Sequence, residues 1–65
     1  MQHKLKVGQI FKANSCDAKL VICGLSDTGY MYQWVGEGVV EHFDNEGDFE
    51  IIMSRSYTPL IEDNI

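Results

Sequence analysis

Proline, cysteine and long apolar runs are all scarce in this chain of 65 residues. One proline and two cysteines, Cys16 and Cys23, are too few for the disulfide framework of a small secreted domain. No apolar run approaches the roughly 18 residues that span a bilayer, and the lysines near the start lead into no signal-peptide segment. We therefore expect a cytoplasmic protein with reduced thiols, in which Cys23, within the apolar run 20–23, is buried.

The length leaves room for one domain, because a second core would need roughly 50 further residues. We assign residues 1–65 to this domain, with a core over about 5–53 and a tail over 54–65. Hydrophobic residues make up 45% and aromatic residues 11%, which argues against an intrinsically disordered chain. A chain this short has little room for a deep active-site cleft.

Basic residues are few and gather at the start of the chain. Residues 1–19 carry four lysines against one aspartate, a balance of +3, whereas residues 20–54 carry seven acids and no lysine or arginine, a balance of −7. A surface field of one sign attracts partners of the opposite sign and repels phosphate backbones, which disfavours nucleic acid as the main ligand. The seven acids are Asp27, Glu37, Glu41, Asp44, Glu46, Asp48 and Glu50.

Helical periodicity is weak, since no window of eleven residues holds an i, i+3, i+4, i+7 apolar stripe without a glycine. Strand-like segments joined by short glycine turns are abundant. We predict an all-β fold, a small five-stranded antiparallel meander curled into a partly open SH3-like barrel. Pro59 excludes a central strand from the tail, which becomes an edge or a frayed end. The predicted strands are residues 7–13, 20–26, 30–35, 39–43 and 49–53.

Three of the predicted turns contain glycine. In residues 27–29, Gly29 is expected to take the left-handed conformation of a three-residue hairpin loop. Residues 36–38 repeat this arrangement, and residues 44–47 form the turn before the last strand.

Four short patterns carry a resemblance to a known group of proteins. They are LxVGQxF at 5–11, LVI at 20–22, GYxY at 29–32 and GDF at 47–49. Over roughly residues 5–53, the chain resembles small SH3-like barrel proteins encoded by bacteriophages and mobile elements. The resemblance implies an accessory or host-modulating role, sometimes inhibition of a bacterial defence system or host enzyme, and it implies no catalytic residue.

The acids of the second half of the chain have two interpretations. They could mimic a phosphate backbone and occupy a basic groove on a nucleic-acid-binding enzyme. They could also be acids that gather in turns and on exposed strand faces and keep a small protein soluble. The residues concerned are Glu37, Glu41, Asp44, Glu46 and Asp48.

An aromatic stripe, Tyr30, Tyr32 and Trp34, occupies alternate positions of one predicted strand, so the three side chains share a face. Facing outward, it would form a rigid platform of the kind that dominates binding hot spots. Facing inward, it would supply the bulky residues that a small core needs. Gln33 on the opposite face favours an inward Trp34.

Metal sites and cofactors are not expected. Cys16 and Cys23 are too far apart in sequence for a zinc knuckle, and no second pair follows. Residues 44–48 imitate the start of a calcium loop, but Phe49 replaces its glycine and Arg55 its closing glutamate, which leaves a solvated turn. His42 could be a metal ligand or a pH-sensitive contact, yet a lone strand histidine is typical of a half-buried structural residue.

Catalysis is not expected either. No nucleophile elbow surrounds a serine, no phosphate-binding glycine motif precedes a helix, and a barrel of this size offers paired carboxylates no pocket that separates their pKa values.

The leading hypothesis is a non-enzymatic protein-binding module, an accessory or inhibitor protein that docks on a basic patch of a host protein. A nucleic-acid-binding module is one alternative, with Lys4, Lys6, Lys12 and Lys19 contacting phosphates. A self-assembling structural subunit is another, through an exposed edge strand at 49–53. The candidate binding residues are Tyr30, Tyr32, Trp34, Glu37, Glu41, Asp44, Glu46 and Asp48.

Overall fold

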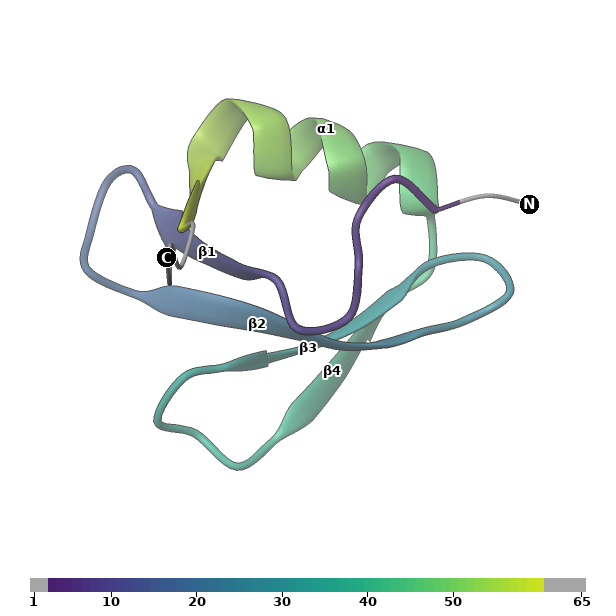
Figure 1. Cartoon of the computed structure of the whole chain (residues 1–65), viewed down its shortest axis with the longest axis horizontal. Coiled ribbons are helices and arrows are strands. Elements are labelled where there is room, and N and C mark those ends of the chain that lie inside the picture. Colours follow the sequence, from purple (N-terminus) through teal and green to yellow (C-terminus); the bar gives the residue numbers. More distant parts are fainter. Residues whose placement is uncertain (1–2, 61–65) are drawn as a thin grey trace, which may run out of the picture.

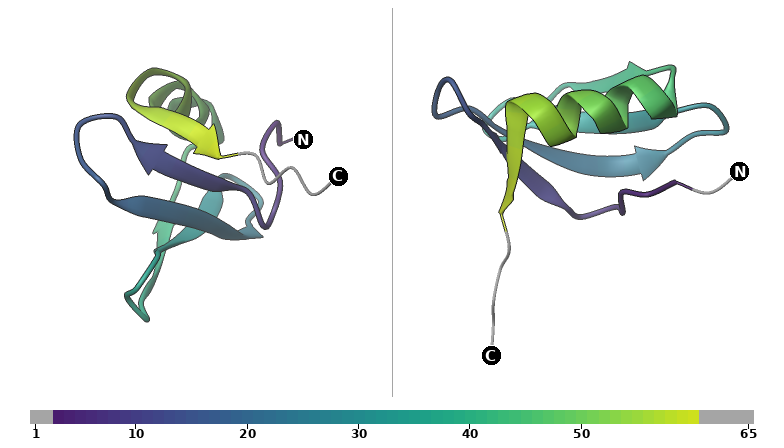
Figure 2. Two further views of the ribbon diagram at one scale, coloured as in Figure 1. Left: turned by 60° about the vertical axis from the view of Figure 1, so that its left-hand side comes forward. Right: turned by 90° about the horizontal axis from the view of Figure 1, so that it is seen from above.

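The computed structural model describes residues 3–60, which form a five-stranded antiparallel sheet and a helix packed across one face of it (Figures 1 and 2). The strands lie in the order β4-β3-β2-β1-β5, and the fold is mainly β. In chain order the elements are β1 (Ile10–Ala13), β2 (Lys19–Leu25), β3 (Tyr30–Trp34), β4 (Val40–Phe43), α1 (Glu46–Ser56) and β5 (Tyr57–Leu60).

Alternation along the strands produces the core. Alternate residues of a strand point to opposite faces, and cross-strand partners share a face. Leu20 pairs with Phe11 of β1 on one side and with Trp34 of β3 on the other, all on the face that α1 covers. The first four strands are therefore confirmed, with β1 beginning at Ile10. The buried cluster consists of Phe11, Leu20, Ile22 and Tyr30 from the sheet and Phe49 and Met53 from the helix.

The thiol of Cys23 is not in this core. The register between β2 and β3 shifts between Ile22 and Gly24, which leaves Cys23 as the extra residue of a β-bulge. Cys16 and Cys23 are both free and exposed. The prediction of a buried Cys23 is wrong, because alternation turns this position away from the face that holds Ile22.

Residues 46–56 form a helix where the sequence predicted a turn, a strand and the first residues of the tail, so the fold is mainly β and not all-β. The Asn45 side chain accepts a hydrogen bond from the backbone N–H of Asp48 at 3.1 Å and caps the helix. Glu46 and Asp48 lie in the first turn, where their negative charges interact favourably with the positive end of the helix dipole. Phe49 and Met53, one turn apart, are buried against the sheet. The predicted turn at 44–47 and strand at 49–53 are therefore wrong.

The last strand returns to pair with the first. β5 pairs with β1 from Ile10↔Leu60 to Ala13↔Tyr57, so β4 and β5 are the two edges of an open sheet. Pro59 lies in this edge strand, and the prediction of an edge is confirmed for residues 57–60. Residues 61–65 lie outside the described part of the chain. The strand order shows no closure, and the barrel stays a prediction.

Two predicted turns use glycine for different reasons. Gly36 has φ +96° and is the left-handed residue of the turn between β3 and β4. Gly29 does not have a positive φ, so that expectation is wrong. A Cβ at Gly29 would overlap the carbonyl oxygen of Phe43, so glycine is needed here for the close approach of two backbones.

The segment before β1 is fastened to both β3 and α1. The backbone N–H of Leu5 donates to the Tyr30 hydroxyl at 3.1 Å, and that of Lys4 donates to Glu50 Oε2 at 3.1 Å. Gly8 adds a backbone bond to Ile22 at 2.7 Å. Within residues 3–60, no helix has the length and apolar character needed to cross a membrane.

Candidate protein-binding surface

The five predicted acidic residues lie between the start of the β3–β4 turn and the first turn of α1. We call them the acidic surface. Four of the five are exposed, and Glu46 is half-buried. The segment that carries them runs along one edge of the sheet, through β4, and then over its covered face at the start of the helix (Figure 1). They are Glu37, Glu41, Asp44, Glu46 and Asp48.

The aromatic stripe faces the helix rather than solvent. Tyr30 is fully buried, and its ring stacks on Phe49 of α1 with centroids 4.9 Å apart. Tyr32 and Trp34 are half-buried at the border of the same cluster. The inward alternative is therefore confirmed for the stripe, and Tyr30 cannot be a surface anchor in this conformation. Tyr32 and Trp34 remain accessible in part.

Glu41 and Tyr32 form a cross-strand pair between β4 and β3. The Tyr32 hydroxyl donates to Glu41 Oε1 at 2.8 Å, which fixes the carboxylate beside the aromatic ring. Burial raises the pKa of Tyr32 to about 12, and the hydrogen bond to Glu41 and its charge act in the same direction. Glu41 is thus a positioned carboxylate on an exposed edge strand.

A shallow pocket of 310 Å³ opens next to this pair. Trp34, Glu37 and Glu41 all line it, so an indole and two acidic residues share one opening. A half-buried indole with carboxylates beside it suits the cationic end of an arginine or lysine side chain, because the ring face and the carboxylates both attract positive charge. Ala18, Lys19 and Val35 complete the lining.

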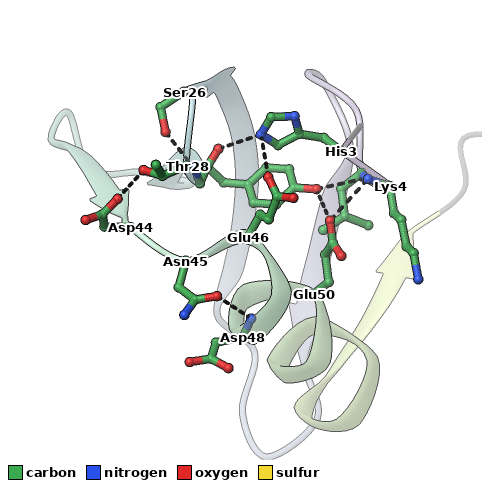
Figure 3. A network of polar contacts seen from close by, with 12 residues as sticks. His3, Lys4, Ser26, Thr28, Asp44, Asn45, Glu46, Asp48 and Glu50 are labelled. Carbon is green, nitrogen blue, oxygen red and sulfur yellow. Dashed lines mark hydrogen bonds and ion pairs between the residues drawn. The ribbon is translucent and has the colours of Figure 1, made fainter. Parts of the chain in front are cut away.

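At the other end of β4, Asp44 and Glu46 are held by the protein itself (Figure 3). The Thr28 hydroxyl donates to Asp44 Oδ1, which joins the β2–β3 loop to the start of the helix. Glu46 Oε1 lies 3.4 Å from His3 Nε2, and the His3 ring packs edge-on against Tyr30. These two acids therefore stabilise the fold as well as contributing charge.

Glu50 was not among the predicted binding residues, although it lies at the centre of a network. Its Oε2 accepts from the Tyr30 hydroxyl at 2.5 Å and from the Lys4 backbone (Figure 3). Burial alone would raise the pKa of Glu50, but the bonds from Tyr30 and Lys4 and the charges of Lys4 and His3 outweigh it and lower the pKa below its usual value. Burial raises the pKa of Tyr30 to about 12, with Glu50 reinforcing the shift. No sequence pattern could reveal this pair while residue 50 was assigned to a strand.

His42 is exposed, so the prediction that it is a half-buried structural residue is wrong. Its Nε2 lies 2.8 Å from the hydroxyl oxygen of Ser26, which also accepts from the backbone N–H of Gly29. No sequence pattern pairs Ser26 with His42, because Ser26 follows β2, His42 lies in β4, and β3 separates the two strands. Among residues 3–60, no group of three or more histidine, cysteine, aspartate or glutamate side chains could hold a metal ion.

The predicted phosphate-contacting lysines do not form one edge. Lys12 and Lys19 are cross-strand partners on the sheet face opposite α1, whereas Lys4 is fastened beside Glu50 of the helix. The Lys12 ammonium also donates to the carbonyl oxygen of Cys16 at 3.2 Å and lies 3.9 Å from Asp17. The predicted pairing edge at 49–53 is part of α1, so self-assembly through that segment as a strand is excluded.

In comparisons with known proteins, no family model, curated protein or solved structure matches this chain.

Proposed function

We propose that the protein is a non-enzymatic binding module that docks its acidic surface on a basic patch of a partner protein. The observation that carries the proposal is the pocket in which Trp34 lies beside Glu37 and Glu41. The accessory or inhibitor role that the phage-protein resemblance implies is part of this proposal.

The pocket supplies an anchor and the surrounding acids supply attraction. Tryptophan and arginine are enriched among residues that dominate binding energy, and a cation over an exposed indole contributes about 0.5–1 kcal/mol. Exposed acids such as Asp44 and Asp48 add little affinity individually, but together they speed association with a basic surface. The binding should therefore weaken as salt screens these charges.

We also assign the fold to a partly open SH3-like barrel as part of the proposal. The contact between the rings of Trp34 and Tyr57 supports this assignment. Their ring centroids are 6.3 Å apart, although β2 and β1 lie between β3 and β5. Three strand spacings of a flat sheet span roughly 14 Å, so curvature would help these rings to meet.

The test uses Trp34 itself, which is the single tryptophan of the chain and lies in the pocket. An acetylated, amidated peptide of alternating arginine and glycine is titrated at low and high salt while the tryptophan fluorescence is followed. We expect saturable binding at low salt that falls steeply as salt rises.

A matched pair of variants locates the binding site. Glu37→Gln combined with Glu41→Gln removes both pocket carboxylates and should weaken binding about tenfold. Asp27→Asn removes an exposed acid from the β2–β3 loop, at the end of β3 away from Trp34, and should leave the affinity within about twofold. Absence of binding, or equal losses in both proteins, would refute the proposal.

A further inference from the structure

The two edges of the sheet differ in how they could accept another strand. β5 carries Pro59, which lacks an N–H, and proline is one of the devices by which proteins block strand edges. β4 (Val40–Phe43) contains no proline and no lysine. Val40, Glu41 and His42 are all exposed. β4 is therefore the edge that remains open to pairing.

The backbone of β4 has a partner on one side only. It pairs with β3 over four residues, from Gln33↔Val40 to Tyr30↔Phe43, and no other strand of residues 3–60 lies beside it. In a ladder, alternate residues direct both N–H and C=O to the same neighbour, so the remaining groups of β4 point away from β3. They form a short template for a sixth strand.

Charge decides which strand suits this template. Glu37 precedes β4, Glu41 lies within it and Asp44 follows it directly, and the segment between them carries no lysine or arginine. Pairing between two copies of β4 would bring these three carboxylates of each copy to one seam, where like charges repel. A strand rich in arginine or lysine would instead meet opposite charges along its whole length.

We propose that an extended basic segment of the partner adds a sixth strand at the free edge of β4. The inference rests on the proposed function and specifies how the partner is held. Glu41 pairs with Tyr32 and Trp34 pairs with Leu20, so both are on the face that α1 covers, and both line the pocket. Cationic side chains at alternate positions of the added strand lie on the same face, about 6.8 Å apart, where one can enter the pocket.

The test separates strand pairing from simple charge attraction. Three acetylated, amidated nine-residue peptides of alternating arginine and threonine are compared: the unmodified peptide, one N-methylated on every threonine and one N-methylated on every arginine. The three have the same charge, but each modified peptide lacks one alternate set of N–H donors. Trp34 fluorescence gives the affinities, and NMR hydrogen exchange gives the protection of the backbone amides of residues 39–43.

We expect the unmodified peptide to bind and to slow exchange at alternate amides of residues 39–43. One modified peptide should bind at least tenfold more weakly, and the other should bind much like the unmodified one. Equal affinities for all three, with no protection of β4, would overturn strand addition and leave the proposed function standing. Binding by none of them would overturn both. Dimers of the free protein in light scattering, with β4 amides already protected, would assign the edge to a second copy instead.

Discussion

The hydroxyl of Tyr30 donates a hydrogen bond of 2.5 Å to Glu50 Oε2, and this contact joins the start of β3 to the helix. The same hydroxyl accepts from the backbone N–H of Leu5, and Glu50 accepts from that of Lys4. Two side chains thus hold three parts of the chain together: β3, α1 and the segment before β1.

Replacement of Tyr30 by phenylalanine should destabilise the protein. The change removes one donor and one acceptor from a half-buried network, and we expect a loss of about 2 kcal/mol in the free energy of unfolding. Urea denaturation followed by circular dichroism measures it. Tyr32→Phe is the control, because its hydroxyl bonds to the exposed Glu41 and its loss should be smaller. Equal losses would show that the Tyr30 network contributes no more than a surface hydrogen bond.

Alkaline pH should weaken the fold through two tyrosines. Burial, together with hydrogen bonds to Glu50 and Glu41, raises the pKa of Tyr30 and of Tyr32 from 10.0 to about 12. A group whose folded pKa is raised contributes stability that is complete below the unfolded pKa and is lost as the pH rises through the folded pKa. Urea titrations between pH 9 and 12 should therefore show a fall in unfolding free energy above about pH 10. The double variant Tyr30→Phe, Tyr32→Phe should show a much shallower fall, and an unchanged slope would contradict the assignment.

The hydrogen bond from the Asp48 N–H to the Asn45 side chain should contribute measurably to the stability of the protein. Asn45→Ala removes the acceptor for the Asp48 N–H and should cost about 1 kcal/mol, whereas Asn45→Ser retains a capping oxygen and should cost less. Thermal unfolding followed at 222 nm compares the three proteins. An alanine variant as stable as the parent would mean that the cap contributes nothing.

Two glycines should respond very differently to alanine. At Gly29 the added methyl group would overlap the carbonyl oxygen of Phe43, and we expect a loss of about 3 kcal/mol. At Gly38 no atom lies within 4 Å of the added group, so Gly38→Ala should change stability by less than about 1 kcal/mol. Chemical denaturation of both variants tests the contrast. Similar effects at the two sites would refute the close approach between the β2–β3 loop and the end of β4.

The sequence predicts the first four strands because each is a short segment rich in β-branched, aromatic or other apolar residues that ends at a local turn or loop. The turn at Gly36 is an example, since its positive φ depends on few neighbours. The helix was missed because its apolar stripe is short: Phe49, Ile52 and Met53 follow helical spacing, but the next position of the stripe is Ser56. Asn45 before two acids and Arg55 in the last turn are nevertheless recognisable helix-start and helix-end residues. Tertiary packing of Phe49 and Met53 overrides the weak local pattern.

The sequence predicts which acidic residues make up the candidate site, but not how the side chains of the site are arranged in space. The acids could be identified because they lie in turns and exposed segments that are recognisable along the chain. The burial of Tyr30 depends on which face of the sheet the helix covers, and Glu50 reaches it only because residues 46–56 are helical. The same dependence on distant elements explains why the sequence identifies Trp34 as a candidate binding residue but does not reveal the pocket that it lines with Glu37 and Glu41.

The pairing of β5 with β1 also determines when the protein can fold. Ile10 and Leu60 are register partners, so β1 acquires its second neighbour only after nearly all of the described chain has been synthesised. Contacts between residues so distant in sequence carry a large loop-closure cost and slow folding. The β2–β3–β4 hairpins can form earlier on the ribosome, but the edge of β1 stays exposed to other nascent chains until the C-terminal strand emerges.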